Sequence, residues 1–289
     1  MNESHEPGRA RARLELLGAA ALFSTGGAAI KACALSSFQV AGFRSLVAAL
    51  ALVLFVPEAR RGFSLRAAAV AVAYAATLVL FVAGNKLTTS ANTIFLQSTA
   101  PLYLLVLGPW LLRERVRRSD ILVLIVAAAG LALFVVQAEP AQRTAPDPFR
   151  GNLCALASGL SWAMTLIGLR WLSASPTNGS AQSAVVLGNV VAFVACAPWA
   201  FPVHGFHPID GLLIAYLGVF QIGLAYALVV RGMRRARALD ASLLLLLEPA
   251  LNPIWTWLVH RETPSNWALA GGALVLAATI GKSVTDSRR

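Results

Sequence analysis

The sequence predicts an all-α integral membrane protein, built as ten transmembrane helices in two inverted five-helix repeats around a central cavity. Hydrophobic residues make up 57% of the 289-residue chain and charged residues only 13%, whereas soluble globular proteins carry about 25% charged residues. The apolar residues fall into ten segments, the basic residues lie mostly on one side of these segments, and the two halves of the chain share a sparse repeat.

Short polar breaks separate ten apolar segments, most of which are near the length that crosses the hydrocarbon core as a helix. A β-barrel would show shorter segments of alternating polarity, whereas here the apolar runs are continuous, as in Leu243–Leu247. Lipid offers no partner for backbone polar groups, so such runs are expected to be helical. The predicted spans are residues 14–32, 38–56, 66–84, 91–111, 119–137, 151–171, 181–200, 211–230, 239–259 and 266–282.

The first span follows a hydrophilic tail, residues 1–13, that carries Arg9, Arg11 and Arg13. A basic start before an apolar stretch is also typical of secretory signal peptides. Residues 14–32 are long enough to span a membrane, they lack a clear A-x-A cleavage site, and many similar segments follow. We therefore interpret them as an uncleaved first helix.

The basic residues predict that both termini are cytoplasmic. With the N-terminus inside and the spans alternating, 18 of the 24 Lys and Arg residues fall in cytoplasmic segments, and Arg44 falls within a span. This bias follows the positive-inside rule. It accounts for the net charge of +11 by attraction to an anionic leaflet, without nucleic acid. The basic residues that fall outside are Lys31, Lys86, Arg143, Arg150 and Arg261.

The two halves of the chain repeat a proline and a glutamate. Pro101 recurs 148 residues later as Pro249, and Glu114 recurs at the same offset as Glu262. Each half holds five spans, an odd number, so the halves cross the bilayer in opposite directions. Inverted repeats are typical of secondary transporters, because the two copies can exchange conformations. The alternative is a duplicated bundle without a transport role.

The domain boundaries follow from this repeat. We expect a first repeat over residues 14–137 and a second over residues 151–282, joined by an external linker, residues 138–150. Residues 1–13 and 283–289 form cytoplasmic tails.

The sequence carries no motif of a metal site, a cofactor site or an enzyme. Cys33, Cys154 and Cys196 are isolated from one another, which argues against metal binding and against a disulfide framework. There is no H-E-x-x-H motif, no P-loop and no pair of aspartates within the spans. We therefore expect no cofactor, no metal and no enzymatic activity, and a channel or a structural bundle stays open as an alternative.

Four stretches of the sequence carry a family resemblance. They are Gln39–Leu46, Ala100–Gly130, Leu160–Trp162 and Glu248–Gly272. These stretches resemble the EamA family of the drug/metabolite transporter superfamily, and the chain as a whole looks like one of its YddG-type amino-acid exporters. The resemblance implies ten helices, a central cavity and a working monomer in the inner membrane of a bacterium. It also implies export of aromatic and other amino acids by alternating access, with other small metabolites or cationic drugs as alternative substrates.

Two charged residues stand well inside the predicted spans, where a charge is costly and tends to face a cavity or a partner. Arg44 is a candidate ligand for a substrate carboxylate, or it snorkels to the interface. Glu248 lies near the midplane of the membrane. It is a candidate to bind a substrate ammonium group or to carry a proton. The alternative is a carboxyl group that stays protonated and hydrogen-bonds a neighbouring helix. Asn252 lies four residues further on the same helix face and joins the candidate site.

Polar residues and prolines mark the fourth and ninth spans. Thr93, Gln97 and Pro101 are spaced by four residues, so they lie on one helix face. Thr93 and Gln97 are candidate substrate ligands, or they hydrogen-bond a neighbouring helix. Pro101 and its repeat mate Pro249 are candidate hinges, because proline interrupts the helical hydrogen-bond ladder.

Aromatic residues are candidates to stack against the side chain of a substrate. Tyr74 lies deep in the third span and Tyr226 lies in the eighth, while Phe23 and Trp162 correspond to one another at an offset of 139 residues. Tyr and Trp near span ends are more often interface anchors. Asn189 within the seventh span and Gln221 within the eighth are further polar candidates.

Overall fold

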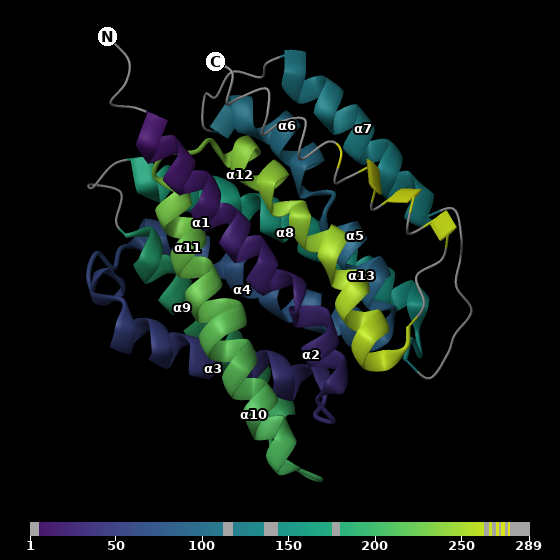
Figure 1. Ribbon diagram of the computed structural model, residues 1–289. Coiled ribbons are helices and arrows are strands. Elements are labelled where there is room, and N and C mark those ends of the chain that lie inside the picture. The colour runs from purple at the N-terminus through teal and green to yellow at the C-terminus, as the bar shows by residue number, and fades with distance from the viewer. Residues whose placement is uncertain are drawn as a thin grey trace.

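The computed structural model describes residues 6–111, 118–135, 144–174 and 180–262, and scattered residues between 266 and 277. The described residues form a bundle of helices and no β-strand (Figure 1). The helices are α1 (Glu6–Ser24), α2 (Gly26–Ala32), α3 (Ser37–Phe55), the 3-10 helix η1 (Pro57–Arg60), α4 (Leu65–Leu87), α5 (Ser90–Gln97), α6 (Ala100–Leu111), α7 (Arg118–Val135), α8 (Pro148–Ala174), α9 (Ala181–Ala200), α10 (Pro208–Tyr216), the π-helical segment η3 (Leu217–Leu224), α11 (Ala225–Met233), α12 (Ala238–Leu245) and α13 (Leu247–His260).

The predicted all-α class is confirmed. Within the described residues, six helices are long and apolar enough to cross a membrane. Helices α3, α4, α7, α8 and α9 each begin and end within three residues of a predicted span. The total of ten spans and the cytoplasmic position of the termini stay predictions.

Some of the predicted features lie outside the described residues. They are most of the tenth span, residues 266–282, together with the C-terminal tail, residues 283–289. Glu114, the repeat mate of Glu262, and residues 138–143 of the predicted linker also lie outside.

Three predicted spans are each divided into two helices, where the sequence predicts one. Two of these breaks occur where side-chain hydroxyls bond to the preceding turn. Between α1 and α2, the Oγ1 of Thr25 donates to the carbonyl oxygen of Leu22 at 2.8 Å. Between α5 and α6, the Oγ of Ser98 donates to the carbonyl oxygen of Ile94 at 2.6 Å. Such bonds compete with the helical ladder and weaken it locally.

The two candidate hinge prolines lie directly after helix breaks. Pro101 is the second residue of α6, and Pro249 is the third residue of α13, which follows a break at Leu246. The first N–H groups of a helix have no partner within the helix. A proline costs little there, so each proline marks the start of a helix rather than a kink within one.

The first and second halves of the chain share one core. α4 packs against α8 and α9, and α3 also packs against α9. Small residues allow the close approach: a Cβ at Gly168 would lie 2.6 Å from Cγ2 of Val70, and a Cβ at Gly188 would lie 2.9 Å from the carbonyl oxygen of Ala71.

We expect Gly188→Ala to lower the melting temperature of the protein in detergent. The added Cβ would meet the backbone of Ala71 and the ring of Tyr74, so α9 must move away from α4 at a cost of about 1–3 kcal/mol. Gly108→Ala is the matched control, because nothing lies within 4 Å of its Cβ. Thermal unfolding followed by intrinsic fluorescence checks the prediction, and equal melting temperatures for the two variants would contradict it.

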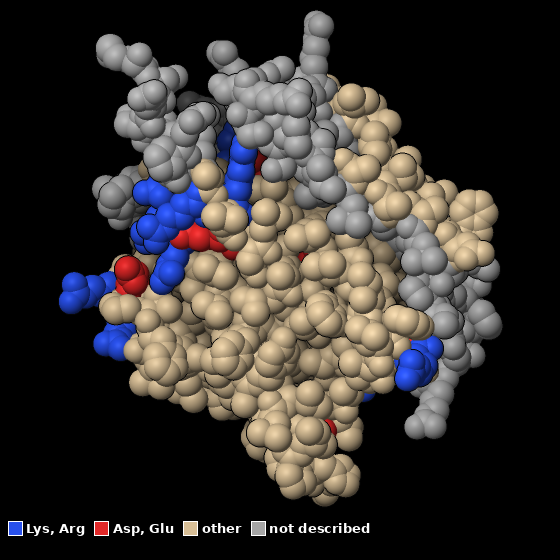
Figure 2. Space-filling model, viewed as in Figure 1, with Lys and Arg blue, Asp and Glu red and all other residues tan. Residues whose placement is uncertain are grey.

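Charge and apolar surface are separated on the face shown in Figure 2. Most of the visible Lys and Arg gather at one end, over α1, α11 and α12, a smaller group lies at the lower right, and the wide band between them carries almost no charge. Exposed apolar side chains such as Trp110, Trp199 and Leu212 lie on the outside of the helices. Contiguous apolar surface of this kind is expected against lipid rather than water.

Candidate functional site

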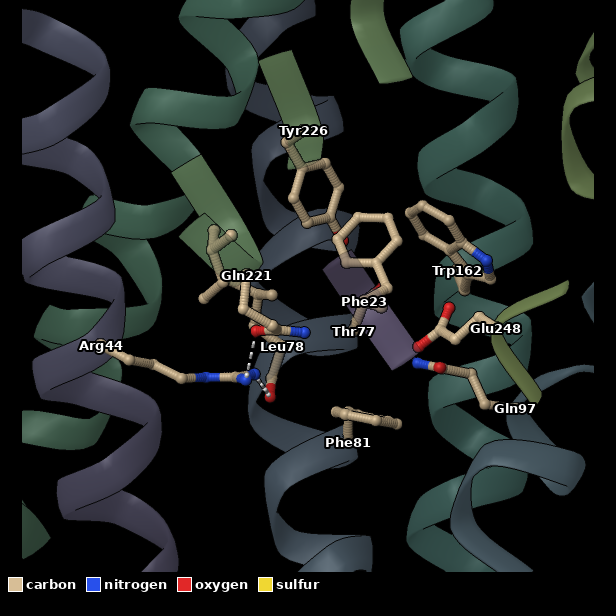
Figure 3. A pocket seen from close by; sticks show the side chains of 11 residues that line it. Phe23, Arg44, Thr77, Leu78, Phe81, Gln97, Trp162, Gln221, Tyr226 and Glu248 are labelled. Carbon is tan, nitrogen blue, oxygen red and sulfur yellow. Dashed lines mark hydrogen bonds between the residues drawn. The ribbon is translucent and has the colours of Figure 1, made fainter. Parts of the chain in front are cut away.

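A small cavity lies within the bundle, where α1, α3, α4, α5, α8, η3, α11 and α13 converge (Figure 3). Both halves of the chain supply its walls. Its volume is about 30 Å³, which is room for one or two water molecules. The lining residues are Phe23, Arg44, Thr77, Leu78, Phe81, Gln97, Trp162, Gln221, Ile222, Tyr226 and Glu248.

Four aromatic residues from four helices form one cluster at the cavity. The ring of Tyr226 lies 5.0 Å from that of Phe23, 4.5 Å from that of Tyr74 and 5.8 Å from that of Trp162, all edge to face. Phe23 and Trp162, which the repeat relates, are also in contact, with ring centres 6.2 Å apart. Asn189 donates to the hydroxyl of Tyr74 at 2.9 Å and holds it in place. Tyr74 supports the cluster from behind, since it does not line the cavity itself.

Arg44 points into the protein rather than toward the membrane surface. Its side chain is 1% exposed, which does not fit the snorkelling alternative. One guanidinium nitrogen, Nη1, donates to Oε1 of Gln221 at 3.3 Å, and Nη2 donates to the carbonyl oxygen of Leu78 at 3.1 Å. Within the described residues, its Nε has no hydrogen-bond partner. A buried guanidinium held by neutral groups alone is a favourable site for an anion.

Glu248 and Gln97 lie together on the side of the cavity opposite Arg44 (Figure 3). Glu248 is 8% exposed, and none of the hydrogen bonds or ion pairs between described residues includes its carboxylate. A second cavity adjoins the first at the breaks before α6 and α13. Gln97, Trp162 and Glu248 line both cavities, and Pro101 lines the second.

Two of the predicted site residues lie away from the cavity. Thr93 is buried against Gly84, and its hydroxyl donates to the carbonyl oxygen of Thr89 at 3.0 Å. Asn252 donates to the carbonyl oxygen of Ser90 at 3.4 Å. Neither residue lines either of the two cavities.

Some residues that line the cavity were not among the candidates predicted from the sequence. Thr77 and Leu78 line it from α4, and Ile222 lines it from η3 next to Gln221. A usable signal existed for Thr77, because it lies three residues after Tyr74 and therefore on the same helix face. No pattern in the sequence marks Leu78, whose backbone oxygen is the group that bonds Arg44.

At the predicted external end, polar contacts join α2, α5 and the end of α13. Glu262 accepts a hydrogen bond from the backbone nitrogen of Ser90 at 3.2 Å, and its other oxygen lies 3.7 Å from Nζ of Lys31. Asn252 adds its bond to Ser90. We call Lys31, Ser90, Asn252 and Glu262 the external contact network. It connects α2, α5 and the end of α13 at this end of the bundle.

Comparison with known proteins adds a family and a fold. The model of the EamA-like transporter family matches residues 12–136 and again residues 149–283. No curated protein matches the chain. Among solved structures, 28 chains match. One of them, a crystal structure of a protein with 17% sequence identity, has a TM-score of 0.72, and the match covers 96% of this chain and 98% of the other.

Proposed function

Because this chain belongs to the EamA-like transporter family, and is therefore a multi-pass membrane transporter, we propose that it exports amino acids across a bacterial inner membrane. The substrates are aromatic and other amino acids, as in the YddG-type exporters that the sequence resembles. The proposed form is a monomer of ten transmembrane helices with both termini in the cytoplasm. It works by alternating access.

The observation that carries the proposal is that a guanidinium group and a carboxyl group lie on two sides of one cavity within the bundle. Arg44 lies on one side and Glu248 on the other (Figure 3). An amino acid brings a carboxylate and an ammonium group, and each would satisfy a buried charge that is costly alone. The aromatic cluster beside them offers apolar contact area to varied side chains, which supports a broad specificity.

Alternating access is supported by the small volume of the cavity. An amino acid does not fit in about 30 Å³, so it enters only after the surrounding helices separate. The breaks before α6 and α13 adjoin the second cavity and are the proposed hinges, next to Pro101 and Pro249. Bending there opens the site toward the cytoplasm while the external contact network stays closed, and the opposite bend releases the substrate outside.

Uptake into proteoliposomes tests the proposal. Purified protein is expected to accumulate labelled phenylalanine and labelled threonine above the level of empty vesicles. Each amino acid should also reduce the uptake of the other, because both use one site. Absence of accumulation of both amino acids would overturn the proposal. An imposed pH gradient then distinguishes facilitated from proton-coupled transport.

Efflux of cationic drugs by the same fold is the second candidate, and Glu248 is the observation that favours it. A cationic drug would pair with Glu248 but leave Arg44 without an anion. Competition experiments decide between the two candidates. Phenylalanine uptake is measured in the presence of a cationic drug or of another amino acid, and stronger inhibition by the drug would favour drug efflux.

We expect Trp162→Ala to reduce phenylalanine uptake about three- to tenfold more than threonine uptake. A contact between two aromatic rings contributes about 0.5–1.5 kcal/mol beyond the burial of apolar area. Phenylalanine loses this contact when Trp162 is removed, whereas threonine has no ring and never makes it. The ratio of the two uptake rates is the measurement. Trp110→Ala is the matched control, because Trp110 is 88% exposed on the outside of α6. A ratio unchanged from that of the control would exclude Trp162 from the wall that holds the substrate ring.

A further inference from the structure

A hydrogen-bond relay holds the amide of Gln97 at the edge of the cavity. Nε2 of Gln97 donates to Oγ of Ser158 at 2.7 Å, and Oγ of Ser158 donates to the carbonyl oxygen of Thr77 at 3.1 Å. All three residues are buried. The relay joins α5, α8 and α4, and Ser158 stands behind Gln97 without lining the cavity.

The relay determines which end of the amide is available. The carbonyl oxygen of Thr77 can only accept, so it takes the single proton of the Ser158 hydroxyl. Ser158 then offers only lone pairs to Gln97, and the amide must turn its NH₂ group toward Ser158. The Oε1 of Gln97 remains. No hydrogen bond between described residues ends on it, and it is not among the fully buried atoms without a partner. Since Gln97 lines the cavity, this oxygen is a free acceptor there.

Glu248 supplies a second acceptor on the same side of the cavity, and the NH₂ end of the Gln97 amide is the end that lies nearer to its carboxylate in Figure 3. Figure 3 shows its carboxylate beside the amide of Gln97, and both residues line both cavities. A primary ammonium group carries three N–H donors and a positive charge, so it can bond a carboxylate and an amide oxygen together. A quaternary ammonium group carries the charge but no N–H, and it would satisfy Glu248 alone.

We propose that Ser158 is a positioning residue that holds Gln97 as an acceptor, so that Gln97 and Glu248 together select substrates with a primary ammonium group. This inference rests on the proposed function and narrows its substrate class. Ser158 accepts the hydrogen bond of the Gln97 NH₂ group, and without its hydroxyl this NH₂ group is free to donate to the nearby carboxylate of Glu248 instead. The two residues then satisfy one another, and the selection for N–H donors is lost.

Three ligands that differ only at the amine test the inference. They are L-phenylalanine, its N,N,N-trimethyl derivative and 3-phenylpropanoate, and their binding to the full chain in detergent is measured by isothermal titration calorimetry. The wild-type protein is expected to bind phenylalanine at least about tenfold more tightly than the trimethyl derivative, and 3-phenylpropanoate more weakly than phenylalanine.

Variants of Ser158 separate positioning from folding. Ser158→Ala is expected to bring the preference for phenylalanine over the trimethyl derivative to within about threefold, whereas Ser158→Thr keeps the hydroxyl and retains the preference. A purely structural defect would weaken all three ligands alike and leave their ratios unchanged. Gln97→Met removes both amide groups at similar length. Gln97→Met is therefore also expected to lose the preference for phenylalanine over the trimethyl derivative. If Ser158→Ala does not fold, this variant tests whether the amide of Gln97 is needed for the preference.

Each outcome has a distinct meaning. If the wild-type protein binds none of the three ligands, the proposed function fails. If it binds phenylalanine and the trimethyl derivative equally, the proposed function stands and this inference is overturned. A folded Ser158→Ala variant that keeps the tenfold preference would overturn the role of Ser158.

Discussion

Replacing Glu248 with glutamine is expected to raise the KM for amino-acid uptake about 10- to 100-fold. A hydrogen bond to a charged group contributes about 1.5–3 kcal/mol, and each step of about 1.4 kcal/mol corresponds to a factor of ten in affinity. Glutamine has nearly the size of glutamate. The carboxylate makes no hydrogen bond or ion pair with other described residues, so substrate binding rather than folding depends on it.

Initial uptake rates in proteoliposomes, measured against substrate concentration, check this prediction. Glu58→Gln is the matched control, because Glu58 is exposed in η1 and does not line the cavity. A KM for Glu248→Gln equal to that of the control would contradict the assignment of Glu248 to the substrate ammonium group. A normal KM combined with loss of the response to an imposed pH gradient would instead identify Glu248 as a proton carrier.

The long helices could be predicted from the sequence because a single physical quantity sets their length. The hydrocarbon core requires about 20 apolar residues in a helix, so α3, α8 and α9 follow the predicted spans closely. The helix breaks could not be predicted in the same way. They depend on local bonds such as that from Ser98 to Ile94. Thr77 and Thr165 bond to the preceding turn in a similar way, yet α4 and α8 continue past them.

The candidate site was predicted best where the cost of burial is highest. Arg44 and Glu248 are charged residues at membrane depth, and both line the cavity. Helical spacing was a weaker guide. Thr93 and Asn252 share a face with Gln97 and Glu248, but four residues along a helix amount to about 6 Å. That displacement moves both side chains out of the cavity and toward the external end, where Asn252 joins the external contact network.

A glycine on α2 is the point of closest approach to that network. A Cβ at Gly27 would lie 2.6 Å from Oδ1 of Asn252 and closer still to Oγ of Ser90. A side chain at this position therefore requires the side chains of Ser90 and Asn252 to move. We therefore expect Gly27→Ala to force this end of the bundle apart and to reduce uptake, because the site no longer closes on the external side.

The thiol of Cys33 is suited to report this opening. Cys33 follows α2 and is 1% exposed. Its burial, with a smaller effect of the nearby Asp210, raises the pKa of the thiol to about 11. A maleimide reacts with the thiolate, so the closed protein should be labelled slowly because the thiol is both hidden and protonated. Exposure to water removes both obstacles at once.

In a Cys154→Ser, Cys196→Ala background, where Cys33 is the remaining cysteine, Gly27→Ala is expected to speed maleimide labelling in detergent at least about tenfold. Gly18→Ala in α1 is the matched control, because its Cβ would meet Leu228 at an ordinary 3.5 Å. Glu262→Gln weakens the same network without adding volume and should speed labelling in the same direction. If Cys33 is labelled at the same rate in all three variants, neither the Gly27 contact nor the carboxylate of Glu262 keeps the external end closed.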